Sequence, residues 1–330
     1  MYYITFNRNT QNNMITKESF EEYKSDKRFI SPSDIKGCKT PLHYFMKKFV
    51  LPKSEPTEAM IIGSAYHTLI LEPEKFEQKY VTLFRQNLPN PEKDFRDSAN
   101  KKYKDDLIKL SKEKSQIILP EETIKQLMDM KVALQTYIKD IDETIIDRQN
   151  GLIENNLYCA VIFDELGTLK EFVKITDKEQ IGKDFVGKRA LFLATRPDYF
   201  NYINFYDLDL KTTTDASPEH FAKECYEMEY DIQAAMGLDI LTCEYGQEFT
   251  DFFFIAQEKT EPYYCANYHC SEEFIQMGVY RYRLRLKRIL EATEAGVFPG
   301  YEINRNFESK VASAIELYLP KWVQNKVFDF

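Results

Sequence analysis

Two acidic residues and a lysine in the middle of the chain have the types and the spacing of a hydrolytic metal site. Asp198 follows a proline, and Asp209 and Lys211 stand two residues apart in the stretch 207–213, where leucines alternate with charged residues. Side chains two apart on a strand face the same side, so Asp209 and Lys211 are expected to point into one cleft. Asp207 shares this parity but lies nearer the start of the strand. Asp198 precedes Asp209 by eleven residues, which is enough for a hairpin to bring the two carboxylates together.

This set of residues suits metal-assisted hydrolysis of a phosphodiester. Close carboxylates repel one another unless a cation lies between them, and a divalent metal ion is the usual cation. A metal-bound water can attack phosphorus, and a neighbouring lysine can orient or deprotonate that water and balance charge on the phosphate. The oxygen-rich ligands predict Mg²⁺ or Mn²⁺. The alternative is a pair of strands with solvated acids, because Asp-X-Lys alone is a common sequence.

The hydrophobic pattern around these residues changes near residue 151. Before it the periodicity is helical, with a buried helix expected over 60–71 and an amphipathic helix over 121–137. After it, strands are expected over 157–163, 190–194, 205–210, 251–256 and 263–268, and helices over 218–242 and 271–294. We therefore expect an α/β fold with a central mixed β-sheet flanked by helices. The chain 1–330 is expected to be a single domain, with a mostly helical N-terminal part over 31–150 and a sheet-containing catalytic core over 151–300.

Three motifs make the chain resemble the PD-(D/E)XK nuclease superfamily. They are Arg196-Pro-Asp198, Asp209-Leu-Lys211-Thr-Thr, and the downstream Tyr230-Asp-Ile-Gln233-Ala-Ala. The resemblance is strongest to the exodeoxyribonuclease VIII (RecE-type) branch, which is related to lambda exonuclease and to RecB-type nuclease domains. Further landmarks of this likeness are the segments 31–33 with 41–44, 63–67 with 71–73, 254–259 with Pro262, and 296–300.

The resemblance implies a two-metal-type site with assigned roles. Asp198 and Asp209 would be metal ligands, the carbonyl of Leu210 a backbone ligand, and Lys211 the catalytic lysine. His67 matches the histidine that RecB-type nucleases place on a helix against the metal. A lone histidine on an apolar helix is otherwise more often a buried core residue.

Two further matches to the family are incomplete. Gln233 falls where the family has a glutamine near the metal-bound water or a DNA phosphate, although it could also be a surface amide. The tyrosine usual one turn later is replaced by Gly237. Glu154 matches an acidic residue that the family uses near the metal. The number of residues between Glu154 and Asp198 is larger than expected, because of an insertion around 174–188. The resemblance thus implies a catalytic role for Gln233 and a metal-binding role for Glu154.

Several polar and basic residues are candidate contacts for DNA. Ser33 is expected to cap a short helix that ends before Pro41, and it is a candidate phosphate contact. Thr212 and Thr213 follow the catalytic lysine and could donate hydrogen bonds to a phosphate. The most basic stretch, 281–288, supplies Arg281 and Arg285, although a solvated helix is the simpler explanation of this stretch. Lys47, Lys48 and Lys53 are alternative phosphate contacts.

Composition constrains the class of protein. The chain has 44 Lys and Arg against 53 Asp and Glu, so its net charge is −9, which argues mildly against nucleic acid. A basic groove inside an acidic protein is nevertheless common, and a metal offsets an acidic site. The six cysteines form no CxxC pair, and their spacing does not predict an iron–sulfur cluster. We see no signal pattern and no long apolar run, so a cytoplasmic protein without a membrane segment is expected.

The expected function is that of a metal-dependent exonuclease. The resemblance implies hydrolysis of linear double-stranded DNA from an end, in phage-type recombination with a single-strand annealing partner, and assembly into a homo-oligomer. An endonuclease of the same superfamily is the first alternative. A non-catalytic DNA-binding protein that kept the fold is the second, and the intact Asp198, Asp209 and Lys211 set weighs against it. The phosphate-binding loop of kinases and helicases is not found in the sequence.

Overall fold

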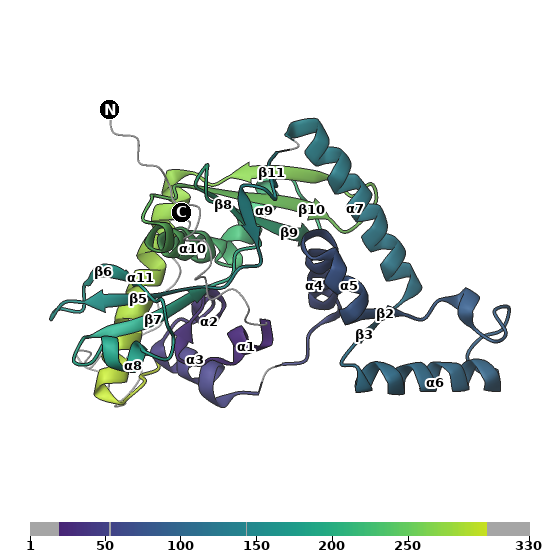
Figure 1. Cartoon of the computed structure of the whole chain (residues 1–330), viewed down its shortest axis with the longest axis horizontal. Coiled ribbons are helices and arrows are strands. Elements are labelled where there is room, and N and C mark those ends of the chain that lie inside the picture. Colours follow the sequence, from purple (N-terminus) through teal and green to yellow (C-terminus); the bar gives the residue numbers. More distant parts are fainter. Residues whose placement is uncertain (1–19, 53, 143, 302–330) are drawn as a thin grey trace, which may run out of the picture.

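The computed structural model of the chain describes residues 20–52, 54–142 and 144–301. Its strands form one five-stranded, one four-stranded and one two-stranded sheet, with helices packed between and around them (Figure 1). The predicted α/β class, with mixed sheets flanked by helices, is confirmed, and the strands are divided among several sheets. Across the described residues, no helix is both long and apolar enough to cross a membrane.

The five-stranded sheet contains the predicted hairpin. Its strand order is β11 (Cys265–His269), β10 (Asp251–Glu258), β9 (Tyr206–Thr213), β8 (Tyr199–Asn201) and β4 (Gly151–Ile153). Strands β9 and β10 are parallel, and the other neighbours are antiparallel. Leu208 and Leu210 of β9 are buried in a cluster with apolar side chains of helices α4 (Glu58–Leu71) and α7 (Glu121–Ile141). The alternation of β9 therefore turns Asp207, Asp209 and Lys211 toward the opposite face.

The four-stranded sheet brings the N-terminal segment to the β8–β9 hairpin. Its order is β1 (Phe29–Ile30), β7 (Ala190–Thr195), β5 (Leu157–Phe163) and β6 (Leu169–Lys174). Strands β1 and β7 are parallel neighbours, with Ile30 opposite Leu193. The residues that follow the two strands therefore emerge at the same edge of the sheet. These are Ser31 after β1, and Arg196 and Asp198 after β7.

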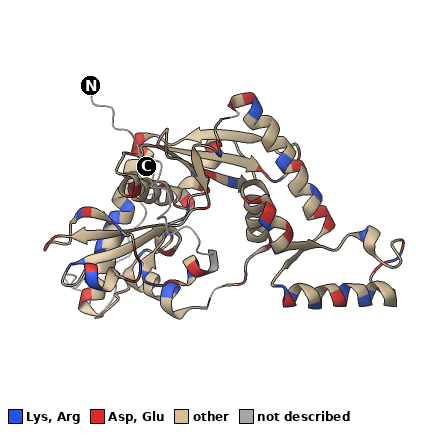
Figure 2. Cartoon of the chain, viewed as in Figure 1, with Lys and Arg blue, Asp and Glu red and all other residues tan. Residues whose placement is uncertain are grey.

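The N-terminal part of the described chain is mostly helical. Besides α4 and α7, it contains α1 (Phe20–Ser25), α2 (Pro32–Ile35), α3 (Pro41–Phe45), a π-helical turn (Met46–Val50), α5 (Pro73–Lys79), a 3-10 turn (Arg85–Asn87) and α6 (Ser98–Glu113), with the parallel strands β2 (Tyr80–Thr82) and β3 (Ile117–Leu119). Helix α6 extends away from the two large sheets (Figure 1). Both signs of charge occur along α6 and α7, so the acidic net charge is not gathered there (Figure 2).

Two local predictions are corrected by the helix ends. The N-cap of α2 is Ser31 and not Ser33, because Ser31 has extended backbone angles and forms a capping box with Asp34. The single helix expected over 218–242 is two helices, α9 (Pro218–Glu227) and α10 (Tyr230–Tyr245). The chain turns between them at Glu229, which has a left-handed backbone with a φ of 53°. The helix expected over 60–71 and the strands around Asp198 and Asp209 are confirmed.

Helix α10 is the element that connects the two large sheets. It contacts β5, β6 and β7 on one side and β9 and β10 on the other. It also packs along α11 (Glu272–Ala295). At Gly278 the two helices are so close that a Cβ would lie 2.0 Å from the carbonyl oxygen of Asp231. A further short helix, α8 (Ile181–Asp184), lies between β6 and β7 in the chain.

Candidate active site

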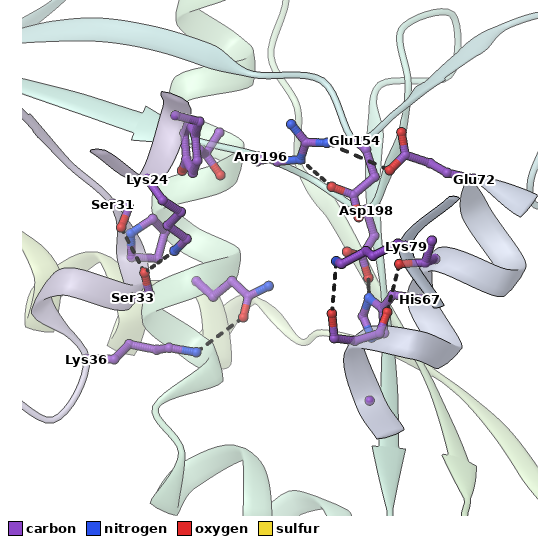
Figure 3. Close-up of a pocket in the computed structure, with 17 residues that line it drawn as sticks. Lys24, Ser31, Ser33, Lys36, His67, Glu72, Lys79, Glu154, Arg196 and Asp198 are labelled. Carbon is purple, nitrogen blue, oxygen red and sulfur yellow. Dashed lines mark hydrogen bonds and ion pairs between the residues drawn. The ribbon is translucent and has the colours of Figure 1, made fainter. Parts of the chain in front are cut away.

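A cleft of about 360 Å³ lies where the two sheets and the N-terminal helices meet (Figure 3). One wall carries hydroxyl and ammonium groups from α1 and α2, and the opposite wall carries carboxylates, a histidine and a lysine from α4, α5 and the sheet edge (Figure 3). The residues of the first wall are Lys24, Ser31, Ser33 and Lys36, and those of the second are His67, Glu72, Lys79, Glu154 and Asp198. Gln233 of α10 also lines the cleft.

The carboxylate of Asp198 is fixed by a backbone N–H of β9 that the short strand β8 leaves unpaired. This strand pairs only with Tyr206 to Leu208 of β9, so the N–H of Leu210 is left without a strand neighbour on that side. The Oδ2 atom of Asp198 accepts a hydrogen bond from that N–H at 2.8 Å. The same oxygen lies 3.1 Å from Nδ1 of His67. The hairpin thus fixes one carboxylate directly before β8 and turns it toward helix α4.

Glu154 completes a three-residue cluster with His67 and Asp198. One ligand atom from each residue lies within 4.8 Å of those of the other two. Glu154 directly follows β4 and has a left-handed backbone with a φ of 50°, a conformation that costs free energy in a residue with a Cβ. Its N–H donates to the carbonyl of Asp198 at 3.2 Å. The insertion that lengthened its distance in sequence therefore does not separate it from Asp198 in space.

Asp209, Lys211 and Gln233 form a second group beside this cluster. The ammonium of Lys211 makes an ion pair with Asp209. Gln233 bridges the two, because its Nε2 donates to Asp209 and its Oε1 accepts from Lys211 at 3.3 Å. The Lys211 ammonium also lies 4.6 Å from the ring centroid of Tyr230. The four side chains predicted to be catalytic, Asp198, Asp209, Lys211 and Gln233, are thus brought together.

The electrostatics of the cluster favour a bound cation. Burial and the neighbouring Asp198 raise the pKa of Glu154 to about 7, against the opposing effects of Arg196 and His67. Burial and Asp198 also raise the pKa of Asp209, although Lys211 opposes them. Burial also acts to raise the pKa of Asp198, but His67, Lys211 and the Leu210 N–H outweigh this effect and lower the pKa. Carboxylates that repel one another in this way regain their charge when a cation is bound between them.

Asp207 is a buried acid outside the cleft. Burial, reinforced by Asp209 and Asp198, raises its pKa well above the usual range. Its Oδ2 would lie 3.0 Å from a Cβ at position 237. Gly237 therefore leaves room for this carboxyl at the place where the resemblance would have put a tyrosine.

The donor set fits a divalent cation. Two carboxylates and one imidazole within 4.8 Å offer the oxygen and nitrogen atoms that Mg²⁺ and, more readily, Mn²⁺ accept. His67, Glu154 and Asp198 would hold the ion, with Asp209 beside them. The carbonyl of Leu210 remains a predicted ligand, and the contact that the structure gives this residue is through its N–H.

Cation binding should be visible as a change in thermal stability. Mn²⁺ at about a hundred times its Kd is expected to raise Tm by about 5 °C or more. The raised pKa of Glu154 means that the metal-free fold loses stability as the pH rises from 4.5 to about 7. The metal-induced increase should therefore be larger at pH 8 than at pH 6, since the ion must displace a proton at pH 6. The shift is measured by thermal unfolding with and without EDTA.

Asp198→Asn should reduce this metal shift strongly. The matched control is Asp106→Asn, because Asp106 is an exposed acid on α6. Equal shifts in the two variants would contradict a cation site at Asp198.

The structure also reveals side chains that the sequence had not singled out. The guanidinium of Arg196 makes an ion pair with Glu154 and donates to Asn156 at 2.9 Å. Its other end lies 3.9 Å from Glu72, the residue that follows α4. Lys36 reaches Gln233 from the opposite wall. Arg196 stood in the sequence only as the first residue of the motif Arg196-Pro-Asp198, without a role of its own, and Glu72 only within the landmark 71–73.

The candidate DNA contacts are placed in different surroundings. Ser33 lines the cleft, with its hydroxyl 2.9 Å from both Lys24 Nζ and Ser31 Oγ. Thr212 lies beside Gly63, a lining residue. The hydroxyl of Thr213 is buried and bonded to Glu224 at 2.7 Å.

Arg281 and Arg285 make ion pairs with acids of helix α10 and its N-cap. Arg281 pairs with Asp231 at 3.1 Å and Arg285 with Glu229 at 2.5 Å. These contacts hold α11 against α10. Binding of DNA by the two arginines stays a prediction.

Comparisons with known proteins agree with this geometry. Residues 171–306 match the model of a family described as a PDDEXK-like domain of unknown function, DUF3799. The matched segment contains Asp198, Asp209, Lys211 and Gln233. The fold resembles a crystal structure from Eubacterium rectale of a protein provisionally named an exonuclease, with 15% identity, a TM-score of 0.51, and coverage of 85% of this chain and 88% of that chain. At this identity the likeness concerns the fold. No curated protein matched the sequence.

Proposed function

We propose that this chain, whose fold is of the PD-(D/E)XK type, is a metal-dependent deoxyribonuclease that hydrolyses linear double-stranded DNA from an end. The observation that carries the proposal is the convergence of two groups in one place. His67, Glu154 and Asp198 offer ligand atoms within 4.8 Å of one another, and Lys211 with Gln233 surrounds Asp209 beside them. A non-catalytic protein would have no need to keep a buried lysine among these acids.

Each side chain has a role in this mechanism. His67, Glu154, Asp198 and Asp209 would hold a divalent cation, which would supply an activated water and neutralise charge on the phosphate. Burial lowers the pKa of Lys211, but Asp209 and Asp198 help to outweigh it and raise it to about 12. Lys211 therefore keeps its proton and acts as a cation that stabilises the negative charge of the transition state.

Gln233 orients the lysine and the acid, which also form an ion pair with each other. Its amide group gives a donor to Asp209 and an acceptor to Lys211. When a phosphate enters, Lys211 can exchange this acceptor for a phosphate oxygen without moving far. Ser33 and Thr212, at or beside the cleft, are proposed to contact the DNA backbone.

End-dependent cleavage is the finer part of the proposal. It is supported by the resemblance to the RecE-type branch and by the provisional name of the Eubacterium rectale protein. A single-strand annealing partner, a homo-oligomer and a role in phage-type recombination belong to the same proposal. An endonuclease of the same superfamily is the alternative, since its catalytic residues would be alike.

The proposal is tested with linear and closed-circular duplexes of the same sequence. We expect loss of the linear DNA with Mg²⁺ or Mn²⁺, no loss with EDTA, and persistence of the circle. Cleavage of the circle would keep the chemistry and replace the exonuclease by an endonuclease. Persistence of both substrates with either metal would contradict nuclease function.

A further inference from the structure

A second lysine reaches the catalytic group from the wall opposite the carboxylates. Lys36 is the C-cap residue of α2, and its ammonium lies 3.3 Å from Oε1 of Gln233 (Figure 3). Lys211 lies at the same distance from the same oxygen. Both ammonium groups also lie over the ring of Tyr230, at 4.9 Å for Lys36 and 4.6 Å for Lys211. One amide oxygen and one aromatic ring are thus shared by two cations.

The backbone around Lys36 is fixed on both sides. Arg285 donates to the carbonyl of Ile35 at 2.9 Å, and the N–H of Gly37 donates to Glu229 at 2.6 Å. Arg285 and Glu229 also form a two-point ion pair with each other. Because Glu229 is the N-cap residue of α10, the helix that carries Gln233, this pair ties the loop to the catalytic helix. The backbone position of Lys36 is therefore set by the fold.

The charges that face Lys36 leave it without a close counter-ion. Among the described residues, its ammonium makes no ion pair with a carboxylate within 4.0 Å. Burial and the nearby Lys211 lower its pKa to about 8, with Lys47 acting in the same direction and Asp209 and Glu229 opposing it. Holding two cations together in a half-buried site costs free energy that an anion between them would recover.

We propose that Lys36 binds a non-bridging oxygen of the phosphate that is cut, on the side of the cleft opposite His67, Glu154 and Asp198. This inference rests on the proposed nuclease function. Lys36 and Lys211 then hold the phosphate together, in place of the Gln233 oxygen that both contact here. Two ammonium groups beside the cluster of His67, Glu154 and Asp198 also explain how an acidic chain can accept a DNA phosphate at this point.

Kinetics and DNA binding of three variants test the inference. Lys36→Met removes the charge, Lys36→Arg keeps it, and Lys39→Met is the control because Lys39 is exposed three residues further on. We expect Lys36→Met to lower kcat by about 10²-fold, as loss of one donor to a developing anion does. Lys36→Arg should recover part of this loss, and Lys39→Met should match the wild-type protein.

The salt dependence of binding gives a second readout, measured with a short duplex in EDTA. The slope of log K against log[salt] should become shallower by about 0.9 in Lys36→Met, as expected for one lost phosphate contact. Thermal stability should stay the same or rise in this variant, because a cation next to Lys211 has been removed. A purely structural role predicts the reverse, a lower Tm with an unchanged salt slope.

Two results would overturn the inference. The first is wild-type kcat and salt slope in Lys36→Met, with DNA still cut, which leaves the nuclease function intact. The second is a lower Tm and lower activity in both Lys36→Met and Lys36→Arg, which would make Lys36 a structural residue. Failure of the proposed function is distinct from both, because the wild-type protein itself would then cut no DNA.

Discussion

Lys211→Ala is expected to lower kcat for DNA cleavage by about 10³-fold, the largest effect of any single change at the site. Lys211 is the buried cation between Asp209 and the ring of Tyr230, and its pKa is raised to about 12. Alanine removes the charge that would meet the phosphate and also leaves Asp209 without its ion-pair partner. The metal-free variant should remain folded, since the Asp209 carboxyl can take up a proton.

The measurement is a single-turnover rate on a linear duplex, with thermal unfolding of each protein beside it. Lys223→Ala is the control, because Lys223 on α9 is 73% exposed and pairs only loosely with Glu227. It should keep the wild-type rate. Retention of more than about a tenth of the rate in Lys211→Ala would contradict the role given to this lysine.

The chemistry of the hairpin could be predicted because it depends on local rules. Strand alternation alone put Asp209 and Lys211 on one face, and the spacing to Asp198 required only a short turn. The structure agrees, with β8 and β9 paired and Asp198 bonded to Leu210. His67 needed the family resemblance, because nothing in an apolar helix says which strand it will face.

Other parts of the site depend on contacts between distant segments. Lys36 and Gln233 are separated by 197 positions, and they meet because β1 and β7 are parallel neighbours and α10 contacts both sheets. The hydrophobic periodicity of the sequence does not indicate which distant segments will pack together. The break between α9 and α10 was missed for a related reason, since Glu229 adopts its left-handed backbone where its carboxylate binds Arg285 and Gly37.

The basic stretch on α11 shows that charged residues can have partners within the chain that the sequence does not indicate. The acids that its arginines meet lie on or next to α10 and are distant from them in sequence. Asp231 and Glu229 take up Arg281 and Arg285, and Asp239 takes up Arg283 at 2.8 Å. A charge run is therefore informative only once its neighbours in space are known.

Gly278→Ala is expected to destabilise the fold by about 2 kcal/mol or more, through overpacking between α10 and α11. The added Cβ would lie 2.0 Å from the Asp231 carbonyl oxygen and 2.9 Å from Cβ of Ala235. Backbone atoms cannot turn aside as a flexible side chain can, so the two helices must separate. The gain in helix propensity from glycine to alanine, about 1 kcal/mol, offsets only part of this cost.

Gly182→Ala is the matched control for this change. Gly182 also lies in a helix, but a Cβ there meets nothing within 4 Å. Urea unfolding should show Gly278→Ala with a lower midpoint and Gly182→Ala with an equal or higher one. Equal midpoints in the two variants would mean that the close packing at Gly278 does not exist in solution.

Gly278→Ala should also lower activity in the protein that remains folded. Separation of the helices would stretch the Arg281–Asp231 and Arg285–Glu229 pairs. The second pair also holds the loop at Lys36 and the start of the helix that carries Gln233. A fall in kcat under conditions where Gly278→Ala is fully folded would therefore connect the packing of the two helices to the position of Gln233. An unchanged kcat under those conditions would mean that the helix packing does not affect the position of Gln233, and that Gly278 contributes only to stability.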